Sequence, residues 1–526
     1  MAAAPTVIIG AGIGGLTSAA ILSARGVPVT VLEKEAQPGG KVRQLEVEGV
    51  PIDAGPTVFT MRPVIENIFE EAGASLDDHL TLTRADRLAR HAWDGTGHLD
   101  LFADPERSAE AVGEFAGAKA AAGFRSFSAE AARIFGILDK PFLRSSKPYP
   151  PNLMWRIGLH RVGALLAIRP YESLWKVLGE HFDDPRLRQL FGRYTTYCGS
   201  SPFHTPATLM LIAHVEQQGV WAIEGGMTAL ANALEAVARQ NGVWFRYGAQ
   251  VTGIHTSRKG VSGVTLESGE HIPTRSVICN ADPSALGAGV FGEGLRRAAK
   301  PMAEKDRSLS AMVWLAKARP QGLPLTHHNV FFSPDYAREF AQIEAGHVPT
   351  DPTAYVCALD HGEEGASDSA SGTAQRFQII VNAPANGDIH DYTAGEKDQC
   401  TSNMMARLRA CGLDLDPAGM DTPMQHRLVT PSDFSTLFPA TGGALYGRAS
   451  HGWAASFLRP GCRTKIRGLY CAGGATHPGA GVPMAALSGT LASEAVLSDR
   501  ISTRWYHRGD IAGGMSTPSA PTAATG

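Results

Sequence analysis

Val7-Ile8-Ile9-Gly10-Ala11-Gly12-Ile13-Gly14-Gly15, close to the start of the chain, is an apolar run that ends in glycines at the G-x-G-x-x-G spacing. Apolar residues at helical spacing follow at once, so the stretch predicts a strand, a tight turn and a helix. Gly10 would allow the turn, Gly12 would let a pyrophosphate approach bare backbone, and Gly15 would let the helix pack on the strand. We interpret Gly10, Gly12, Ile13, Gly14 and Gly15 as part of a dinucleotide site.

A second apolar run, residues 27–32, predicts the next strand and ends at Glu33. This carboxylate follows the glycines by about twenty residues, where it can accept hydrogen bonds from both hydroxyls of an adenosine ribose. A carboxylate there also repels a 2'-phosphate, which argues against NADP and leaves FAD or NAD. Glu33 and its neighbour Lys34 are therefore candidate cofactor-binding residues.

The composition is that of an ordinary globular protein. The 526 residues are 44% hydrophobic and 19% charged, and this length suits two or three domains. The formal net charge of -3 gives no general attraction to nucleic acid, so we expect no nucleic-acid partner.

The cysteines and the apolar runs limit the compartment and the chemistry. The seven cysteines are scattered, with no C-x-x-C pair and no Cys/His pair at metal spacing, so we expect neither disulfides nor a metal site. We interpret the adjacent His327 and His328 as loop histidines. The N-terminus lacks a signal peptide and no run reaches about 18 apolar residues, so we expect a cytoplasmic protein without a membrane span.

Two segments behind Glu33 carry a family resemblance. Pro38-Gly39-Gly40-Lys41-Val42 is a glycine turn followed by a basic side chain, and Asp53-Ala54-Gly55-Pro56-Thr57 follows it. Here the chain resembles the flavin amine oxidase and carotenoid desaturase superfamily, in which these two motifs follow the first nucleotide-binding unit. The resemblance implies FAD rather than NAD. It adds these candidate cofactor-binding residues: Gly40, Lys41, Pro56, Thr57, and Val251, whose backbone would contact the adenine.

The closing motif is Ala472-Gly473-Gly474-Ala475-Thr476-His477-Pro478-Gly479-Ala480-Gly481-Val482-Pro483-Met484. An apolar strand ends in a glycine pair and a small-residue helix begins, and such a helix start can hold the pyrimidine end of a flavin. The H-P-G-A-G-V-P string resembles bacterial phytoene-type desaturases. With Met484 behind it, the string is more similar to the hydroxyneurosporene or methoxyneurosporene 3,4-desaturase branch than to phytoene desaturase itself. Gly473, Gly474, Pro483 and Met484 complete the candidate cofactor-binding residues.

The resemblance implies an α/β fold with a Rossmann-like FAD-binding domain assembled from residues 1–60, 221–308 and 431–506. An α+β substrate domain, residues 309–430, would be inserted in it, and residues 61–220 would form a mainly helical region for substrate and membrane contact. We expect a solvated loop at 362–373 and a disordered tail at 507–526.

Residues 148–182 alternate apolar side chains and tryptophans with basic ones, as an interfacial helix on an anionic bilayer does. An amphipathic helix that covers a core explains the same pattern. Because the resembled desaturases take water-insoluble polyenes out of the membrane, we predict a peripheral, monotopic contact with a membrane surface.

Three residues are candidates for catalysis. Arg193 and Tyr194 lie in a segment that resembles the lining of the desaturase substrate tunnel, although a capped helix end also explains them. His477 is the candidate polar group near the flavin ring, and a turn-stabilising role explains it equally. We interpret Arg84, Arg87 and Arg90 as a solvated helix or loop face.

The resemblance thus implies an FAD-dependent desaturase that introduces a C=C bond into a carotenoid by hydride transfer to flavin. A quinone or oxygen would accept the electrons. Phytoene desaturase, a flavin amine oxidase and a non-redox carotenoid isomerase remain alternatives. A prenyl-protein escort protein, which shares the fold and only binds, is a further one.

Overall fold

Five parallel strands form a central sheet in the order β10-β2-β1-β14-β22. The strands come from three distant parts of the chain: β1 (Thr6–Ile9), β2 (Val29–Leu32), β10 (Trp244–Arg246), β14 (Val277–Cys279) and β22 (Leu469–Cys471). The residues of β1, β2, β14 and β22 are all buried, which explains why these strands read as continuous apolar runs rather than alternating ones. The predicted Rossmann-like α/β fold is confirmed.

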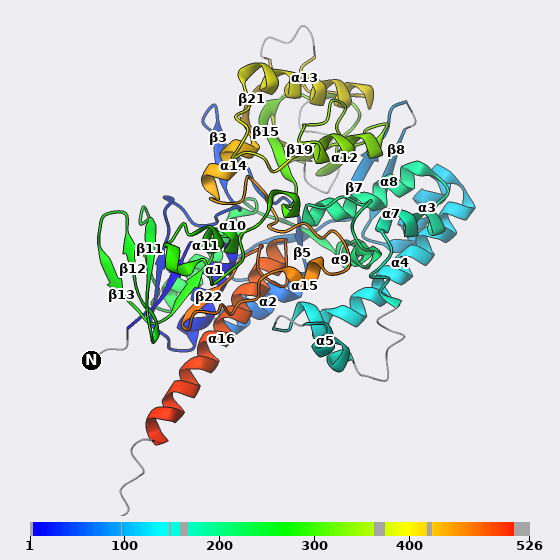
Figure 1. Ribbon diagram of the computed structural model, residues 1–526. Helices are drawn as coiled ribbons and strands as arrows, with labels where there is room; N and C mark the ends of the chain where they lie inside the picture. Colours follow the sequence, from blue (N-terminus) through cyan, green and yellow to red (C-terminus); the bar gives the residue numbers. More distant parts are fainter. Residues whose placement is uncertain are drawn as a thin grey trace, which may run out of the picture.

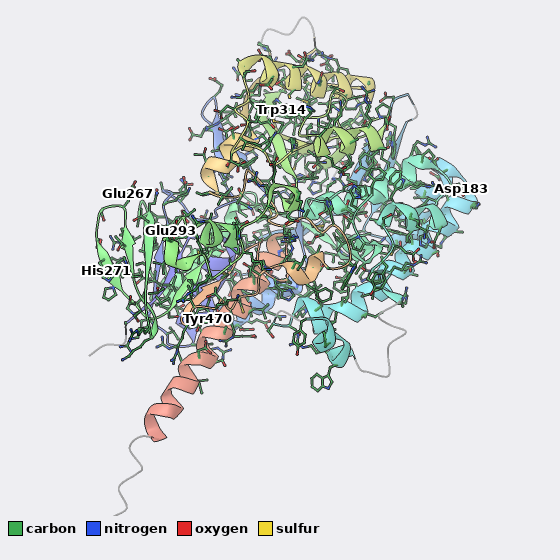
Figure 2. The ribbon with its side chains drawn as sticks, in the orientation of Figure 1. Asp183, Glu267, His271, Glu293, Trp314 and Tyr470 are labelled. Carbon is green, nitrogen blue, oxygen red and sulfur yellow. The ribbon has the colours of Figure 1, made fainter. Side chains whose placement is uncertain are left out.

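Helices cover this sheet (Figure 1). α1 (Ile13–Ala24) packs against α10 (Thr228–Gln240) and α16 (Val482–Gly509). The contact between α1 and α16 is close at Gly489, where an added Cβ would lie 2.4 Å from the carbonyl oxygen of Gly14. Tyr470 of β22, marked in Figure 2, donates its hydroxyl hydrogen to Asp499 of α16 at 2.6 Å. The last helix is thereby fixed to both the sheet and the first helix.

An antiparallel sheet of β11 (Val251–Ser257), β12 (Gly260–Leu266) and β13 (His271–Pro273) lies at the edge of this domain, where Figure 2 marks Glu267 and His271. Val251, a candidate cofactor-binding residue, begins β11, and β12 is the middle strand of this sheet.

A second, seven-stranded sheet has the order β21-β15-β19-β18-β17-β7-β8. Its strands are β7 (Arg87–Ala92), β8 (His98–Phe102), β15 (Ser310–Ala318), β17 (His328–Phe331), β18 (Ala354–Ala358), β19 (Gln375–Ala383) and β21 (Gln425–Val429). Helices α12 (Tyr336–Glu344) and α13 (Ala394–Ala410) belong to the same domain (Figure 1). Trp314 of β15, labelled in Figure 2, is fully buried and donates its indole N–H to Thr401 of α13 at 2.9 Å.

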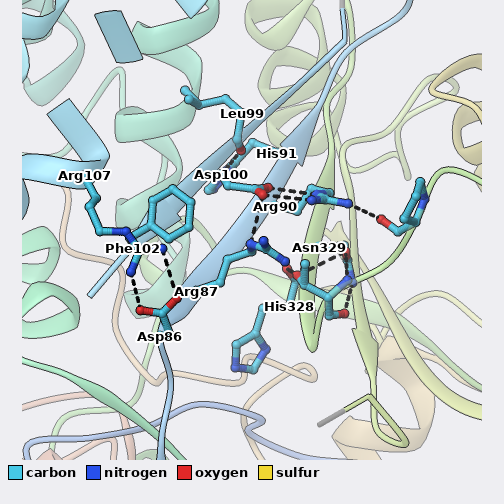
Figure 3. A network of polar contacts seen from close by, with 12 residues as sticks. Asp86, Arg87, Arg90, His91, Leu99, Asp100, Phe102, Arg107, His328 and Asn329 are labelled. Carbon is cyan, nitrogen blue, oxygen red and sulfur yellow. Dashed lines mark hydrogen bonds and ion pairs between the residues drawn. The ribbon is translucent and has the colours of Figure 1, made fainter. Parts of the chain in front are cut away.

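Part of the region expected to be mainly helical forms strands. β6 (Leu82–Arg84), β7 and β8 interrupt residues 61–220, and β7 pairs with β17 of the second sheet. Arg90 of β7 is buried and forms a two-pronged ion pair with Asp100 of β8 at 2.8 Å, as Figure 3 shows. The prediction of a solvated face is therefore wrong for Arg90, because the paired carboxylate compensates its buried charge. Arg84 and Arg87 are exposed, as predicted, but they lie on the strands β6 and β7 and not on a helix or loop.

Helices make up most of the rest of this region (Figure 1). They are α2 (Arg62–Glu71), α3 (Pro105–Ala116), α4 (Ala118–Leu138), η1 (Asp139–Leu143), α5 (Pro150–Ile157), α7 (Leu174–His181), α8 (Pro185–Gly192), η3 (Arg193–Cys198), η4 (Ala207–Met210) and α9 (Leu211–Gln217). Phe124, Phe127, Phe182 and Phe191, which are fully buried, form their common core.

Shorter elements connect these parts. They are β3 (Gln44–Val47), β4 (Val50–Asp53), β5 (Phe59–Thr60), β9 (Val220–Ile223), α11 (Pro283–Ala288), η5 (Glu293–Leu295), η6 (Glu304–Asp306), β16 (Gln321–Gly322), β20 (Leu413–Asp414), α14 (Pro431–Leu437) and α15 (Ala455–Leu458).

The computed structural model describes residues 4–95, 97–146, 149–157, 167–361, 374–417 and 423–509. The predicted loop at 362–373, nearly all of the predicted tail, and residues 158–166 of the basic apolar segment lie outside these ranges. Within them, no helix combines the length and the apolar character needed to cross a bilayer.

Candidate functional site

One cavity of about 610 Å³ is lined by residues of both sheets and of the helical region. Its walls include the turn between β1 and α1, the end of β2, η3, α9, and the glycines behind β22. A volume of this size is typical of sites that take cofactors and small ligands.

The turn before α1 is closely packed. A Cβ on Gly12 would lie 2.6 Å from the side-chain nitrogen of Asn280, and a Cβ on Gly14 would lie 2.6 Å from the backbone nitrogen of Gly473. Gly15 does not line the cavity, but its Cβ would lie 2.2 Å from the carbonyl oxygen of Gly10, so it lets the helix pack on the turn. The helix start therefore meets the cavity as bare backbone, which is suited to an anion such as a pyrophosphate.

Glu33 follows β2 and lines the same cavity. Its carboxylate is 6% exposed and accepts hydrogen bonds from the backbone N–H groups of Ala11, at 2.6 Å, and Glu35, at 2.9 Å. These bonds fix the carboxylate beside the glycine turn, where it can accept further hydrogen bonds from a ribose.

The other candidate cofactor-binding residues also lie on the wall of this cavity. They are Gly10, Ile13, Lys34, Gly40, Lys41, Pro56, Thr57, Val251, Gly473, Gly474, Pro483 and Met484. The Lys34 ammonium donates a hydrogen bond to the Leu437 carbonyl, and Lys41 donates one to the Leu445 carbonyl. Burial lowers the pKa of Lys41, despite the opposite effect of Asp282.

The residues that line this part of the cavity are suited to FAD. The side-chain-free helix start, the carboxylate behind β2, and the second glycine pair before α16 would hold the pyrophosphate, the ribose and the flavin end respectively.

A buried polar group lies on another wall of the cavity. Arg193 is 7% exposed, and its Nη1 donates to the hydroxyl of Tyr197 at 3.2 Å. The Glu216 carboxylate accepts hydrogen bonds from Tyr197 at 2.9 Å and from Tyr194 at 2.7 Å. Burial raises the pKa of Glu216, and the two hydroxyls and Arg193 oppose that rise.

Tyr355 extends this polar wall. Its hydroxyl lies 2.7 Å from both the Thr57 hydroxyl and Nδ1 of His328. The Arg193 guanidinium carbon lies 5.0 Å from the ring centroid of Tyr197 and 5.5 Å from that of Tyr355, within the range of cation–π attraction. Arg193, Tyr197, Glu216 and Tyr355 all line the cavity, and we call them the polar wall.

Two of the three candidates for catalysis lie off the cavity. Tyr194 is buried behind the wall, with its hydroxyl on Glu216. His477 is buried with Nε2 3.0 Å from the carbonyl oxygens of both Phe142 and Ser145, so it connects the closing motif to the segment around η1. These positions favour the structural role for both residues, and of the three candidates only Arg193 lines the cavity.

The interpretation of loop histidines is wrong for His328, which is buried and begins β17. The side-chain ligand atoms of His327, His328 and Cys357 lie within 4.8 Å of one another. Each of these three side chains already has a partner: Cys357 Sγ lies 3.5 Å from Nε2 of His327, and His328 lies beside Tyr355. Burial raises the pKa of the Cys357 thiol to about 12 and lowers that of His327, so the cluster holds neutral groups.

Tyr197, Glu216 and Tyr355 also line this cavity and were not predicted from the sequence. Tyr197 is four positions from Arg193 in the same short 3-10 helix, so closeness in the chain was the available signal for it. Glu216 and Tyr355 are 23 and 162 positions from Arg193 in the numbering, so no local pattern connects them.

Comparison with known proteins also indicates a flavin-dependent oxidoreductase. Residues 13–497 match the family model of flavin containing amine oxidoreductases. The chain is 49% identical to hydroxyneurosporene desaturase of Rubrivivax gelatinosus, over 98% of this chain and 97% of that one. It is 28% identical to 1-hydroxycarotenoid 3,4-desaturase of a Flavobacterium species, over 93% and 98%.

Among solved structures, an oxidoreductase from Methanosarcina mazei shares the fold with a TM-score of 0.56 at 18% identity, over 94% of this chain and 100% of that one. The chain therefore belongs to the flavin containing amine oxidoreductase family, as its glycine-lined cavity and its two nucleotide-binding motifs indicate.

Proposed function

We propose that this chain is an FAD-dependent desaturase that introduces a C=C bond at the 3,4 position of a 1-hydroxy- or methoxyneurosporene-type carotenoid. The observation that carries the proposal is that a dinucleotide cradle and an apolar wall line one and the same cavity. The 49% identity with a hydroxyneurosporene desaturase over nearly the whole chain supports the substrate class.

FAD would be held by the glycine turn, Glu33, and the glycines before α16. When bound, it would accept the hydride that leaves the substrate, while a proton leaves the neighbouring carbon. The task of the protein is to hold the polyene in one orientation and to exclude water. Leu143, Leu211, Ile212 and Val215, on η1 and α9, provide an apolar surface for this purpose.

We also propose that the protein associates peripherally with the cytoplasmic side of a membrane, where the water-insoluble substrate is dissolved. Tyr149, Trp155, Tyr171, Trp453 and Leu458 are between 50% and 72% exposed. They lie on or beside α5 and α15, which are near one another in Figure 1, and the rings of Tyr171 and Trp453 are 5.9 Å apart. Leu143, just ahead of α5, lines the cavity, so this aromatic surface adjoins the apolar wall.

Exposed aromatic side chains of this kind anchor proteins in the interfacial layer of a bilayer. A location in the membrane would give the enzyme access to a quinone as the electron acceptor, with oxygen as the other candidate.

The test is anaerobic turnover of the purified protein with FAD and a quinone in liposomes. The liposomes carry either 1-hydroxyneurosporene or phytoene, and the polyene absorption spectrum is followed. A red shift with the hydroxylated substrate alone supports the proposal, and a shift with phytoene reassigns the chain to phytoene desaturation. If neither spectrum shifts while flavin is bound, the carotenoid assignment fails, and a screen with amines would test the oxidase alternative.

A further inference from the structure

Arg193 has unused hydrogen-bonding capacity. A guanidinium carries five N–H donors. Within the described residues, a single hydrogen bond leaves this side chain, to the Tyr197 hydroxyl, and no carboxylate lies within 4.0 Å of it. Buried donors in folded proteins nearly always have an acceptor, so four unmatched N–H groups on a residue that is 7% exposed indicate a missing partner.

The Glu216 carboxylate, whose charge acts on Arg193, already has other hydrogen-bond partners. Glu216 accepts hydrogen bonds from Tyr194 and Tyr197, and Tyr197 in turn accepts the hydrogen bond from Arg193. Glu216 therefore holds Tyr197 in position but leaves the guanidinium free to face a ligand. Since Arg193 lines the cavity, the missing acceptor belongs to whatever occupies the cavity.

A pure hydrocarbon cannot supply this acceptor, whereas a substrate with a hydroxyl or methoxy group at C1 can. The oxygen on C1 is separated from C3 by only two carbon–carbon bonds, and C3 is part of the bond to be desaturated. A group that binds this oxygen must therefore lie in the same cavity as the flavin, and Arg193 does.

We propose that Arg193 binds the oxygen atom of the substrate end group, and that Tyr197 and Glu216 position the guanidinium for this contact. Arg193 is then a specificity-determining residue, which selects C1-oxygenated polyenes and places their 3,4 bond at the flavin. This inference rests on the proposed function. The planar guanidinium, attracted to the rings of Tyr197 and Tyr355, keeps one orientation, which a lysine ammonium would not do.

The experiment compares the Arg193→Met and Arg193→Lys variants with the wild-type holoenzyme on two substrates, 1-hydroxyneurosporene and neurosporene. A hydrogen bond from a charged donor contributes about 1.5–3 kcal/mol, so kcat/KM for the hydroxylated substrate should fall by roughly 10–100-fold in Arg193→Met. The value for neurosporene should be unchanged or higher. Dissociation constants for both polyenes, from fluorescence quenching of the enzyme, should show the same difference without turnover.

Tyr194 and Tyr197 provide a matched pair, because both hydroxyls donate to Glu216, whereas the Arg193 guanidinium donates to the hydroxyl of Tyr197 and not to that of Tyr194. Tyr197→Phe should reduce the preference for the hydroxylated substrate, and Tyr194→Phe should keep it. Bound FAD and melting temperature, measured on each variant, identify any variant that has simply lost its fold.

The outcomes separate the two proposals. If the wild-type enzyme converts neither polyene, the proposed function fails. If the wild-type enzyme converts 1-hydroxyneurosporene, the desaturase function stands. The assignment of Arg193 to the oxygen is then overturned by either of two results for Arg193→Met: an equal loss of activity and affinity for both polyenes, or no loss for either.

Discussion

Gly14 and Gly473 are 459 positions apart, yet a Cβ on Gly14 would lie 2.6 Å from the backbone nitrogen of Gly473. Neither backbone can move freely, because Gly14 is in α1 and Gly473 follows β22. Gly14→Ala should therefore destabilise the fold by about 1–3 kcal/mol, as overpacking does, and weaken FAD binding. Thermal unfolding and flavin content measure both effects. Gly395→Ala, in α13, has open space around it and serves as the control. A Gly14→Ala protein with normal flavin content would contradict this description of the cradle.

Glu33 is expected to control cofactor affinity. Glu33→Gln keeps the shape of the side chain but removes the charge that binds Ala11 N–H and, in our proposal, the ribose. The FAD dissociation constant should increase by roughly 10–100-fold, which corresponds to the loss of a charged hydrogen bond. Equilibrium titration of the apoprotein measures it, and Glu267→Gln, an exposed substitution on the edge sheet, should leave it unchanged. Equal affinities for the wild type and Glu33→Gln would exclude this role.

The Tyr355 hydroxyl lies between Thr57 and His328, at 2.7 Å from each. Tyr355→Phe leaves two polar groups without that partner in a buried setting, so the free energy of unfolding should fall by about 1–3 kcal/mol. Denaturant unfolding measures the loss. Tyr171→Phe, at a ring that is 71% exposed, should unfold like the wild type. If Tyr355→Phe left the free energy of unfolding unchanged, water would have to replace the lost hydroxyl.

Glu339 should make the stability depend on pH. Its side chain is 1% exposed, and burial raises the pKa of Glu339 from 4.5 to about 7. Between these values the folded protein binds more protons than the unfolded chain, so stability decreases as the pH rises from 4.5 to 7 and then levels off. The free energy of unfolding should fall by at most about 3 kcal/mol on account of Glu339. Denaturant midpoints across this range should fall less steeply in Glu339→Gln, and parallel profiles would contradict the assignment.

The exposed tryptophans offer a test of membrane contact. Trp155 and Trp453 are 72% and 50% exposed, and Trp244, on β10, is 60% exposed. If the surface around α5 and α15 enters the bilayer, replacing both Trp155 and Trp453 by alanine should reduce liposome cosedimentation at least tenfold, and Trp244→Ala should not. Equal cosedimentation of all three proteins would rule out this surface as the contact.

Sequence was most informative where the relevant residues are neighbours in the chain. The glycine turn, Glu33 and the closing motif are short, contiguous patterns, and their residues share one cavity wall. The strand β7 was missed because Arg-Leu-Ala-Arg-His-Ala carries charge at positions that burial normally excludes. Arg90 is acceptable there because it pairs with Asp100 of β8 and donates a hydrogen bond to the Pro324 carbonyl, 234 positions away. His477 was misleading because its motif marks the family, whereas its ring contacts carbonyls 332 and 335 positions away.

The strand order of the central sheet also has a consequence for biosynthesis. β22 and the glycines behind it are translated long after the glycine turn, yet they form one wall of the nucleotide cradle. A ribosome-bound nascent chain therefore lacks a complete pocket until about residue 484 has emerged from the exit tunnel. We therefore expect a chain that stops before β22 to lack this wall of the cradle and to bind no FAD, however much FAD the cell contains.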